Sequence, residues 1–305
     1  MRARRVPSES SLCCGIERFA RWPAFVIIAI CIAAIVGPFG WRYSAVAQQN
    51  LVTMQDRPPS LDHPFGTDQA SRDVLARVLV GARVSLTVAA LSVLISATIG
   101  TLYGLVAGYV GGALDAAMMR ILDALLSIPR VLLLIAVLAL WYPVPLTGLI
   151  ALLGLTGWFG VSRLVRAEVR ASRNQEYVFA AHALGAGHWR VMLRHLLPNV
   201  LAPVIVAATL GVGNVIVLEA GLSYLGVGVQ QPLPSWGSIF LDGSGSFATA
   251  WWIALFPGIA IVATVLAFNV LGDALRDLLD PRQVDRVAAS PVKRQRREHG
   301  PRARA

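Results

Sequence analysis

Long runs of uncharged, apolar residues constrain the fold of this chain more than any other feature of its sequence. A helix needs about 20 such residues to cross a bilayer, and the 305-residue chain contains several runs of about that length. Of all residues, 56% are apolar and only 14% are charged, whereas soluble domains carry about a quarter charged residues. The sequence therefore predicts an all-α, multi-pass membrane protein and argues against a water-soluble enzyme.

Six of these runs are candidate membrane spans. The first, residues 22–41, lies between Arg21 and Arg42 and has a tryptophan at each end, which favours an uncleaved anchor over a signal peptide. The other five are approximately residues 84–110, 116–140, 146–162, 199–218 and 250–271. An even number of spans puts both termini on the same side of the membrane.

The distribution of basic residues indicates which side that is. If the termini are cytoplasmic, the cytoplasmic segments hold most of the Lys and Arg residues, and the outer segments hold only Arg42, Arg57, Arg72, Arg77 and Arg83. This distribution follows the positive-inside rule, so we expect cytoplasmic termini. The predicted order is a cytoplasmic tail (1–21), a first span (22–41), an extracytoplasmic loop (42–83), a five-helix core (84–275) containing an inner loop (163–199), and a basic cytoplasmic tail (276–305).

The third predicted span carries charged residues, which are costly inside a bilayer unless they face protein or water. Arg120 and Asp123 are three residues apart on one helical face and are expected to pair at the cytoplasmic end. Pro129 and Arg130 follow deeper in the same run. On the preceding span, glycines spaced about four apart predict close packing of helix backbones: Gly100, Gly104, Gly108, Gly111 and Gly112.

The inner loop is long, basic and amphipathic, unlike a simple turn between spans. Small residues around Ala180 and Ala181 permit close docking of a short helix, Gly185 and Gly187 break that helix, and Pro198 is expected to end the next one before the following span. Such a helix-turn-helix suits transmission of a partner's movement to the bundle. The alternative is an amphipathic helix that lies on lipid headgroups.

Residues 179–181, then Gly185, then His195-x-Leu197-Pro198 resemble the loop motif of bacterial ABC importer permeases, Glu-Ala-Ala-x3-Gly-x9-Ile-x-Leu-Pro. The spacing matches throughout. Phe179 stands where the motif has Glu, and His195 stands where it has Ile. The resemblance implies the type I ABC importer transmembrane fold and a loop that couples to ATPases through these residues: Glu176, Phe179, Ala180, Ala181, Gly185, His195, Leu197 and Pro198.

Further strings, spread over about residues 64–282, are similar to the second permease subunit of the dipeptide and oligopeptide importer branch. They include residues 64–68, 81–86, 225–228, 234–237 and 256–258. The resemblance implies a bacterial cytoplasmic membrane protein that pairs with a second, related permease and binds two cytoplasmic ATPases. An extracytoplasmic binding protein would deliver the substrate, with peptides favoured over glutathione or nickel complexes.

We expect no catalysis, cofactor or metal in this chain, so ATP and Mg belong to the partner ATPases. The sequence has no GxxxxGK[ST] phosphate loop, no GxSxG elbow and no HExxH motif. Cys13, Cys14 and Cys31 form no ligand pattern. The basic tail is expected to be disordered and attracted to anionic lipid headgroups rather than to nucleic acid.

Two other functions are weighed against the importer. A gradient-driven transporter or channel would need carboxylates or broken helices within the membrane core. Apart from Asp115 and Asp123 near one end of a span, the predicted spans contain no carboxylate. An intramembrane enzyme would need paired catalytic groups, which the sequence does not show. Glu219 and Asp242 are acidic candidates on the outer side, with solvated loop positions as the favoured interpretation. The outer loop is either a contact for a partner or a solvated linker.

Overall fold

The computed structural model describes residues 9–51 and 53–279, and this part of the chain is helical apart from loops and turns. The elements are α1 (Glu9–Gly40), α2 (Val74–Val110), α3 (Gly112–Leu126), α4 (Arg130–Leu140), α5 (Leu146–Ser172), α6 (Glu176–Ala183), α7 (His188–Val191), a π-helical turn η1 (Met192–Leu196), α8 (Leu197–Tyr224), α9 (Trp236–Ser244) and α10 (Trp252–Leu279). The predicted basic cluster at residues 293–297 lies outside the described residues.

The helices that are long and apolar enough to cross a membrane agree with the predicted spans. Five qualify singly, and α3 with α4 qualifies as a pair bent by 69°, which gives up to six crossings. The third predicted span, at residues 116–140, corresponds to this bent pair. Pro129 has no backbone N–H to donate and disfavours helical geometry at the residue before it, so the helix breaks at residues 127–129.

Several helices extend beyond their apolar runs because the charged residues at their ends find partners. Helix α2 begins at Val74, where Arg77 pairs with Asp68. Helix α5 continues to Ser172, and its Arg166 binds Asp115 of α3 through two hydrogen bonds of 2.5 and 2.7 Å. The expected pairing of Asp123 with Arg120 is replaced by an ion pair between Asp123 and Arg163 of α5.

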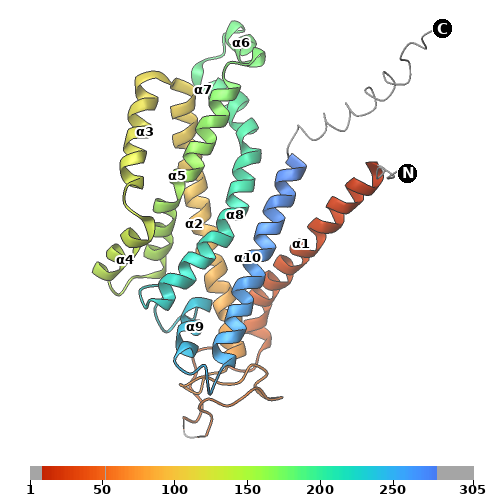
Figure 1. The fold of residues 1–305 in the computed structure, drawn as a ribbon, viewed down its shortest axis with the longest axis vertical. Helices are drawn as coiled ribbons and strands as arrows, with labels where there is room; N and C mark the ends of the chain where they lie inside the picture. Colours follow the sequence, from red (N-terminus) through yellow and green to blue (C-terminus); the bar gives the residue numbers. More distant parts are fainter. Residues whose placement is uncertain (1–8, 52, 280–305) are drawn as a thin grey trace, which may run out of the picture.

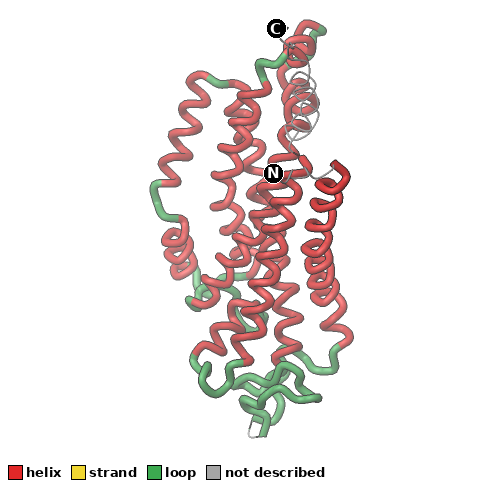
Figure 2. Tube along the Cα trace, turned by 45° about the vertical axis from the view of Figure 1, so that its right-hand side comes forward, coloured by secondary structure: helices red, strands yellow, loops and turns green. Residues whose placement is uncertain are grey.

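The two ends of the bundle differ in structure (Figures 1 and 2). At one end lie α6 and α7, together with the start of α1 and the end of α10. At the other end lie α9 and the loop of residues 41–73, which is folded into a cap. Both ends of the described chain are therefore on the same side as the inner loop, as an even number of crossings requires.

The centre of the bundle is the close contact between α2 and α5, which contact each other more extensively than any other pair. Small residues permit this approach: a Cβ atom added at Gly100 would lie 2.7 Å from Cβ of Val161, and one added at Gly104 would lie 2.8 Å from Cβ of Val165. Gly108 is equally close to α5, with the Arg166 carbonyl 2.9 Å from its added Cβ. The predicted role in helix packing is confirmed for Gly100, Gly104 and Gly108, whereas Gly111 and Gly112 form the turn between α2 and α3 with φ of +70° and +60°.

This contact predicts the effect of adding one methyl group. Gly104→Ala should destabilise the folded state by about 1–3 kcal/mol, because overpacking forces the α2 and α5 backbones apart. Gly160→Ala is the matched control, since nothing lies within 4 Å of its added Cβ. Thermal unfolding in detergent should show a lower midpoint for Gly104→Ala only, and equal midpoints for the two variants would contradict the packing described.

Candidate functional site

Helix α6 has one face buried against the bundle and one face exposed. Val178 and Ala181 are both buried, as expected for residues three apart, which share one face of a helix. Phe179 and Ala180 are exposed on the other side, with Phe179 61% exposed. Glu176 is exposed in the first turn, where a carboxylate interacts favourably with the helix dipole. Anchor residues and exposed residues therefore alternate within one short helix.

Gly185 ends α6 in a Schellman motif. Its backbone N–H donates to the His182 carbonyl at 2.9 Å, and the N–H of Ala186 donates to the Ala181 carbonyl at 3.0 Å. This motif needs a left-handed residue, and Gly185 has φ of +82°. A glycine is required here by backbone geometry rather than by space, since nothing lies within 4 Å of an added Cβ.

The segment after Gly187 runs into the next span without interruption. Helix α7, turn η1 and α8 form one helix from His188 to Tyr224, so the prediction that Pro198 ends a separate helix is wrong. A proline is tolerated there because it lies in the first turn of α8, directly after the π-helical turn. His195 and Leu197 are half-buried, and Pro198 is exposed.

The inner loop is tied to the end of α2 by Tyr109 and Arg173. The Tyr109 hydroxyl contacts Nδ1 of His188 at 2.7 Å and Nε2 of His182 at 3.3 Å, so it joins α7 and α6. The Arg173 guanidinium donates to the carbonyls of Gly108 and Tyr109 at 3.2 and 3.3 Å, and a cation there complements the C-terminal end of the α2 dipole.

A second tie connects α6 to α8. Nδ2 of Asn199 donates to the Tyr177 hydroxyl at 2.9 Å and to the His195 carbonyl at 3.1 Å. Beneath both ties lies an apolar cluster that α2, α5, α6, α7, η1 and α8 share. Its buried members are Leu105, Val165, Val169, Val178, Ala181, Val191, Met192, Leu196, Val200 and Val204.

Comparison with known proteins identifies this arrangement. The family model described as binding-protein-dependent transport system inner membrane component matches residues 100–285. The chain is 43% identical over 259 residues to the dipeptide transport system permease protein DppC of Bacillus subtilis, covering 85% of this chain and 80% of that protein. It belongs to the family of binding-protein-dependent transport system inner membrane components.

Two further relatives agree. The oligopeptide transport system permease protein OppC of Bacillus subtilis is 40% identical over 257 residues, covering 84% of this chain and 83% of that protein. OppC of Haemophilus influenzae is 38% identical over 261 residues, covering 85% of this chain and 82% of that protein. The prediction of a multi-pass, inner-membrane ABC importer permease, in which ATP hydrolysis belongs to partner subunits, is confirmed.

The permease places its predicted coupling residues in two groups. The first is α6 with its Gly185 cap, and the second is the start of α8 at residues 195–198. The Tyr177–Asn199 hydrogen bond brings the groups together. The contact made by Tyr109 could not be predicted from the sequence, because its histidine partners are 73 and 79 residues away in the chain and no local pattern marks the contact.

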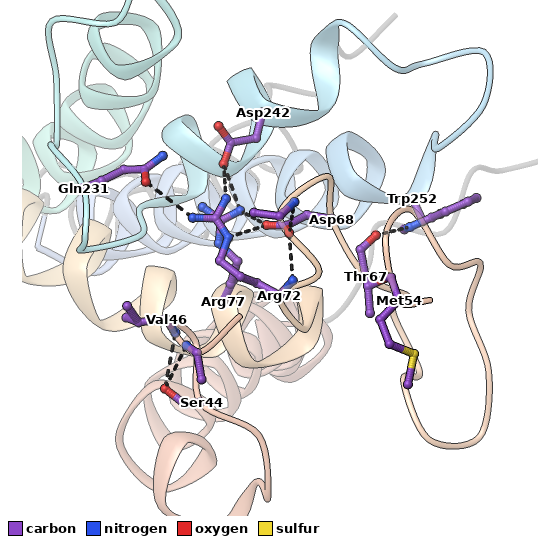
Figure 3. Close-up of polar contacts among 12 residues, drawn as sticks. Ser44, Val46, Met54, Thr67, Asp68, Arg72, Arg77, Gln231, Asp242 and Trp252 are labelled. Carbon is purple, nitrogen blue, oxygen red and sulfur yellow. Dashed lines mark hydrogen bonds and ion pairs between the residues drawn. The ribbon is translucent and has the colours of Figure 1, made fainter. Parts of the chain in front are cut away.

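The outer loop of the permease is a packed cap rather than a solvated linker. Figure 3 shows its charged centre, where Asp68 accepts from Nη1 of Arg77 at 2.5 Å and from Nε of Arg72 at 2.7 Å. Asp242 pairs with the same two arginines at 2.8 and 3.3 Å. Asp68 and Arg77 are 1% and 2% exposed, and Arg72 and Asp242 keep 13% and 26% of their side chains exposed, so the network is buried at its centre and partly open to solvent at its edge.

Other contacts fasten this cap to the spans. Asp73 caps α2 by accepting from the Ala76 N–H, and its carboxylate also binds His63 and Trp41. Nε1 of Trp252, at the start of α10, donates to the Thr67 carbonyl at 3.0 Å. Burial raises the pKa of the Asp56 carboxyl, and the charge of Asp68 raises it further.

The expectation that Glu219 and Asp242 are solvated loop positions is wrong. Glu219 lies within α8 and is fully buried, accepting hydrogen bonds from the Ser223 hydroxyl at 2.7 Å and the Ser85 hydroxyl at 3.0 Å. Asp242 lies in α9 within the ionic network. The bundle therefore does hold a buried carboxylate, and its partners are neutral hydroxyl groups of α2 and α8.

The ionic network predicts unequal effects for two aspartates of the cap. Asp68→Asn should destabilise the permease by about 3–5 kcal/mol, because it leaves buried guanidinium groups without their central carboxylate. Asp62→Asn is the matched control: its side chain is 77% exposed and pairs with Arg42, and an exposed pair contributes about 0–1 kcal/mol. Thermal unfolding in detergent measures both, and similar midpoints would show that the cap does not depend on Asp68.

Proposed function

We propose that this chain is a permease subunit of an ATP-driven peptide importer. It would form the transport path with a second, homologous permease, bind two cytoplasmic ATPases, and receive peptide from an extracytoplasmic binding protein. The relatives at 38–43% identity are named for dipeptide and oligopeptide transport, which supports peptides over glutathione or nickel complexes. The buried Glu219 lends no support to a gradient-driven alternative, because its partners all lie within the chain.

The exposed apolar side chains of the inner loop carry this proposal. Phe179, Leu184 and Trp189 are 61%, 89% and 64% exposed, on or beside α6 and α7. Exposed large apolar groups at one site indicate a contact with a protein or a membrane. Since Ala180 beside them is small, an ATPase surface can approach the α6 backbone closely. Phe179 in place of the motif's Glu would make this docking contact apolar.

The anchors beneath this surface provide the mechanical coupling. Movement of α6 would be passed to α2 through Tyr109 and to α8 through the Tyr177–Asn199 hydrogen bond. Because the shared apolar cluster is closely packed, the inner ends of these helices should move as a unit. ATP-driven closure of the ATPases would then rock the permease between inward-facing and outward-facing arrangements.

We further propose that the α6–α7 end is cytoplasmic, with both termini on that side. The basic residues in and just after the second half of α5, and in α7 and η1, support the orientation: Arg163, Arg166, Arg170, Arg173, Arg190 and Arg194. The cap of residues 41–73 and α9 would then face the binding protein. In this orientation the apolar surfaces of the long helices face the membrane between the two ends.

Co-purification from native membranes tests the assembly. A tagged chain, solubilised gently, should bring down a second permease and ATPase subunits in stoichiometric amounts, as identified by mass spectrometry. Uptake of a radiolabelled dipeptide by the same cells should be lost when the gene is deleted. Recovery of the chain alone or as a homo-oligomer would overturn the proposal, because no energy source would remain.

The Schellman motif predicts a coupling defect without a steric clash. Gly185→Ala should cost about 1–2 kcal/mol, because alanine is strained in the left-handed conformation, and the loosened end of α6 should lower peptide uptake more than ATP hydrolysis. Gly185→Asn should retain more uptake, since asparagine tolerates that conformation better.

Gly187 provides the control for this prediction. It has φ of −69° and nothing within 4 Å of an added Cβ, so Gly187→Ala should transport as the wild type does. Uptake per ATP hydrolysed, measured in reconstituted vesicles, distinguishes the variants. An equal ratio for Gly185→Ala and wild type would remove α6 from the coupling mechanism.

A further inference from the structure

Arg130 is a cation inside a membrane span with no carboxylate partner in the described part of the chain. Ion pairs are present for Arg42, Arg72, Arg77, Arg163, Arg166 and Arg170, whereas none in residues 9–51 and 53–279 involves Arg130. It is the first residue of α4, after the 15 residues of α3. Its contacts on α5, Leu153 and Thr156, lie about 10 and 15 Å along that helix from its start at Leu146, at 1.5 Å per residue, so Arg130 lies within the span rather than at its end.

The guanidinium is held in place by neutral groups of α5. Its Nε donates to Oγ1 of Thr156 at 3.2 Å, and its Nη2 donates to the Leu153 carbonyl at 2.9 Å. Gly157 leaves room for it, because a Cβ added there would lie 3.3 Å from Nη2. These two bonds orient the guanidinium and leave its charge unneutralised. A fixed, unneutralised cation in a span must face water or a partner rather than lipid.

The break beside Arg130 leads to the same conclusion independently. Residues 123–129 are all exposed, including the non-helical residues between α3 and α4. Figures 1 and 2 show this pair at the edge of the bundle. Non-helical backbone at membrane depth is tolerated only where protein buries it or where it lines a water-filled cavity. Both the charge and the exposed backbone therefore exclude a lipid-facing position.

We propose that Arg130 lies on the transport path and binds the C-terminal carboxylate of the passing peptide, an inference that rests on the proposed function. Every free peptide with an unmodified end carries this group whatever its side chains, so one arginine would serve substrates of varied sequence. Guanidinium groups bind carboxylates with directional, charge-assisted hydrogen bonds. Thr156, Gly157 and the Leu153 carbonyl act as positioning groups that aim the guanidinium.

Transport kinetics of the complete complex test this role. In vesicles with saturating binding protein and radiolabelled alanyl-alanine, Arg130→Gln should lower the maximal uptake rate by about tenfold, as expected for loss of one charged hydrogen-bonding group. Arg130→Lys should restore part of that loss. Arg120→Gln, an exposed arginine of the same bent span, is the matched control and should transport normally. Unchanged uptake by Arg130→Gln would overturn the inference.

Recovery of the assembled complex tests whether Arg130 binds the carboxylate of the substrate or a carboxylate of the partner permease. Arg130→Gln should recover the partner permease in the wild-type amount, and reduced recovery would assign Arg130 to the subunit interface instead. If the wild-type complex imports no peptide, the proposed function fails and this inference fails with it. If the wild type imports peptide and Arg130→Gln does so equally well, only the inference fails.

Access of water to the break provides a second measurement. In a background with Cys13, Cys14 and Cys31 replaced by serine, Ile128→Cys should react with an anionic, membrane-impermeant thiol reagent during turnover, and alanyl-alanine should slow that reaction. Ile28→Cys on α1 is the matched control, since Ile28 and Ile128 are 56% and 51% exposed. Labelling of Ile128→Cys no faster than that of Ile28→Cys would overturn the placement on the path.

Discussion

The close contact between α2 and α5 is the constraint on which the rest of the structure depends. Gly100, Gly104 and Gly108 let the two backbones approach until α5 atoms occupy the space of a side chain. In a membrane, where lipid is as apolar as the helices, such close packing is the main attraction available between spans. One end of α2 then holds the cap through Asp73 and Arg77, and the other end holds the α6–α7 loop through Tyr109.

Several charged groups of the permease find their partners within the chain. Asp68 with Arg77 and Asp115 with Arg166 are buried or half-buried pairs that balance within the chain, and Glu219 accepts from hydroxyl groups. Arg130 and Glu219 both lie within spans and have only neutral partners, but Glu219 is fully buried in the bundle, whereas Arg130 lies beside the exposed break between α3 and α4. Ion pairs within the chain maintain the fold, whereas an unpaired cation beside an exposed break points to a group supplied from outside the chain.

Much of this was predictable from the sequence, because spans and glycine spacing are local patterns. The apolar runs located every long helix, and the residues around Gly185 predicted a short helix that ends at that glycine, as α6 does. Helix ends were placed wrongly where a charged residue is neutralised by a distant partner, as Arg77 is by Asp68 and Asp242. The sequence places Glu219 in a loop because the uncharged run ends at Leu218, whereas in the structure Glu219 is buried and accepts from Ser223 of α8 and from Ser85, 134 residues away.

The most direct test of the account is to find what the α6–α7 surface touches in the assembled transporter. A photoreactive phenylalanine analogue placed at Phe179 should crosslink to an ATPase subunit in native membranes. The same analogue at Leu61, which is fully exposed on the cap, should crosslink to no ATPase. Crosslinking of the ATPase from position 61, or crosslinking to lipid alone from position 179, would contradict the coupling role of α6.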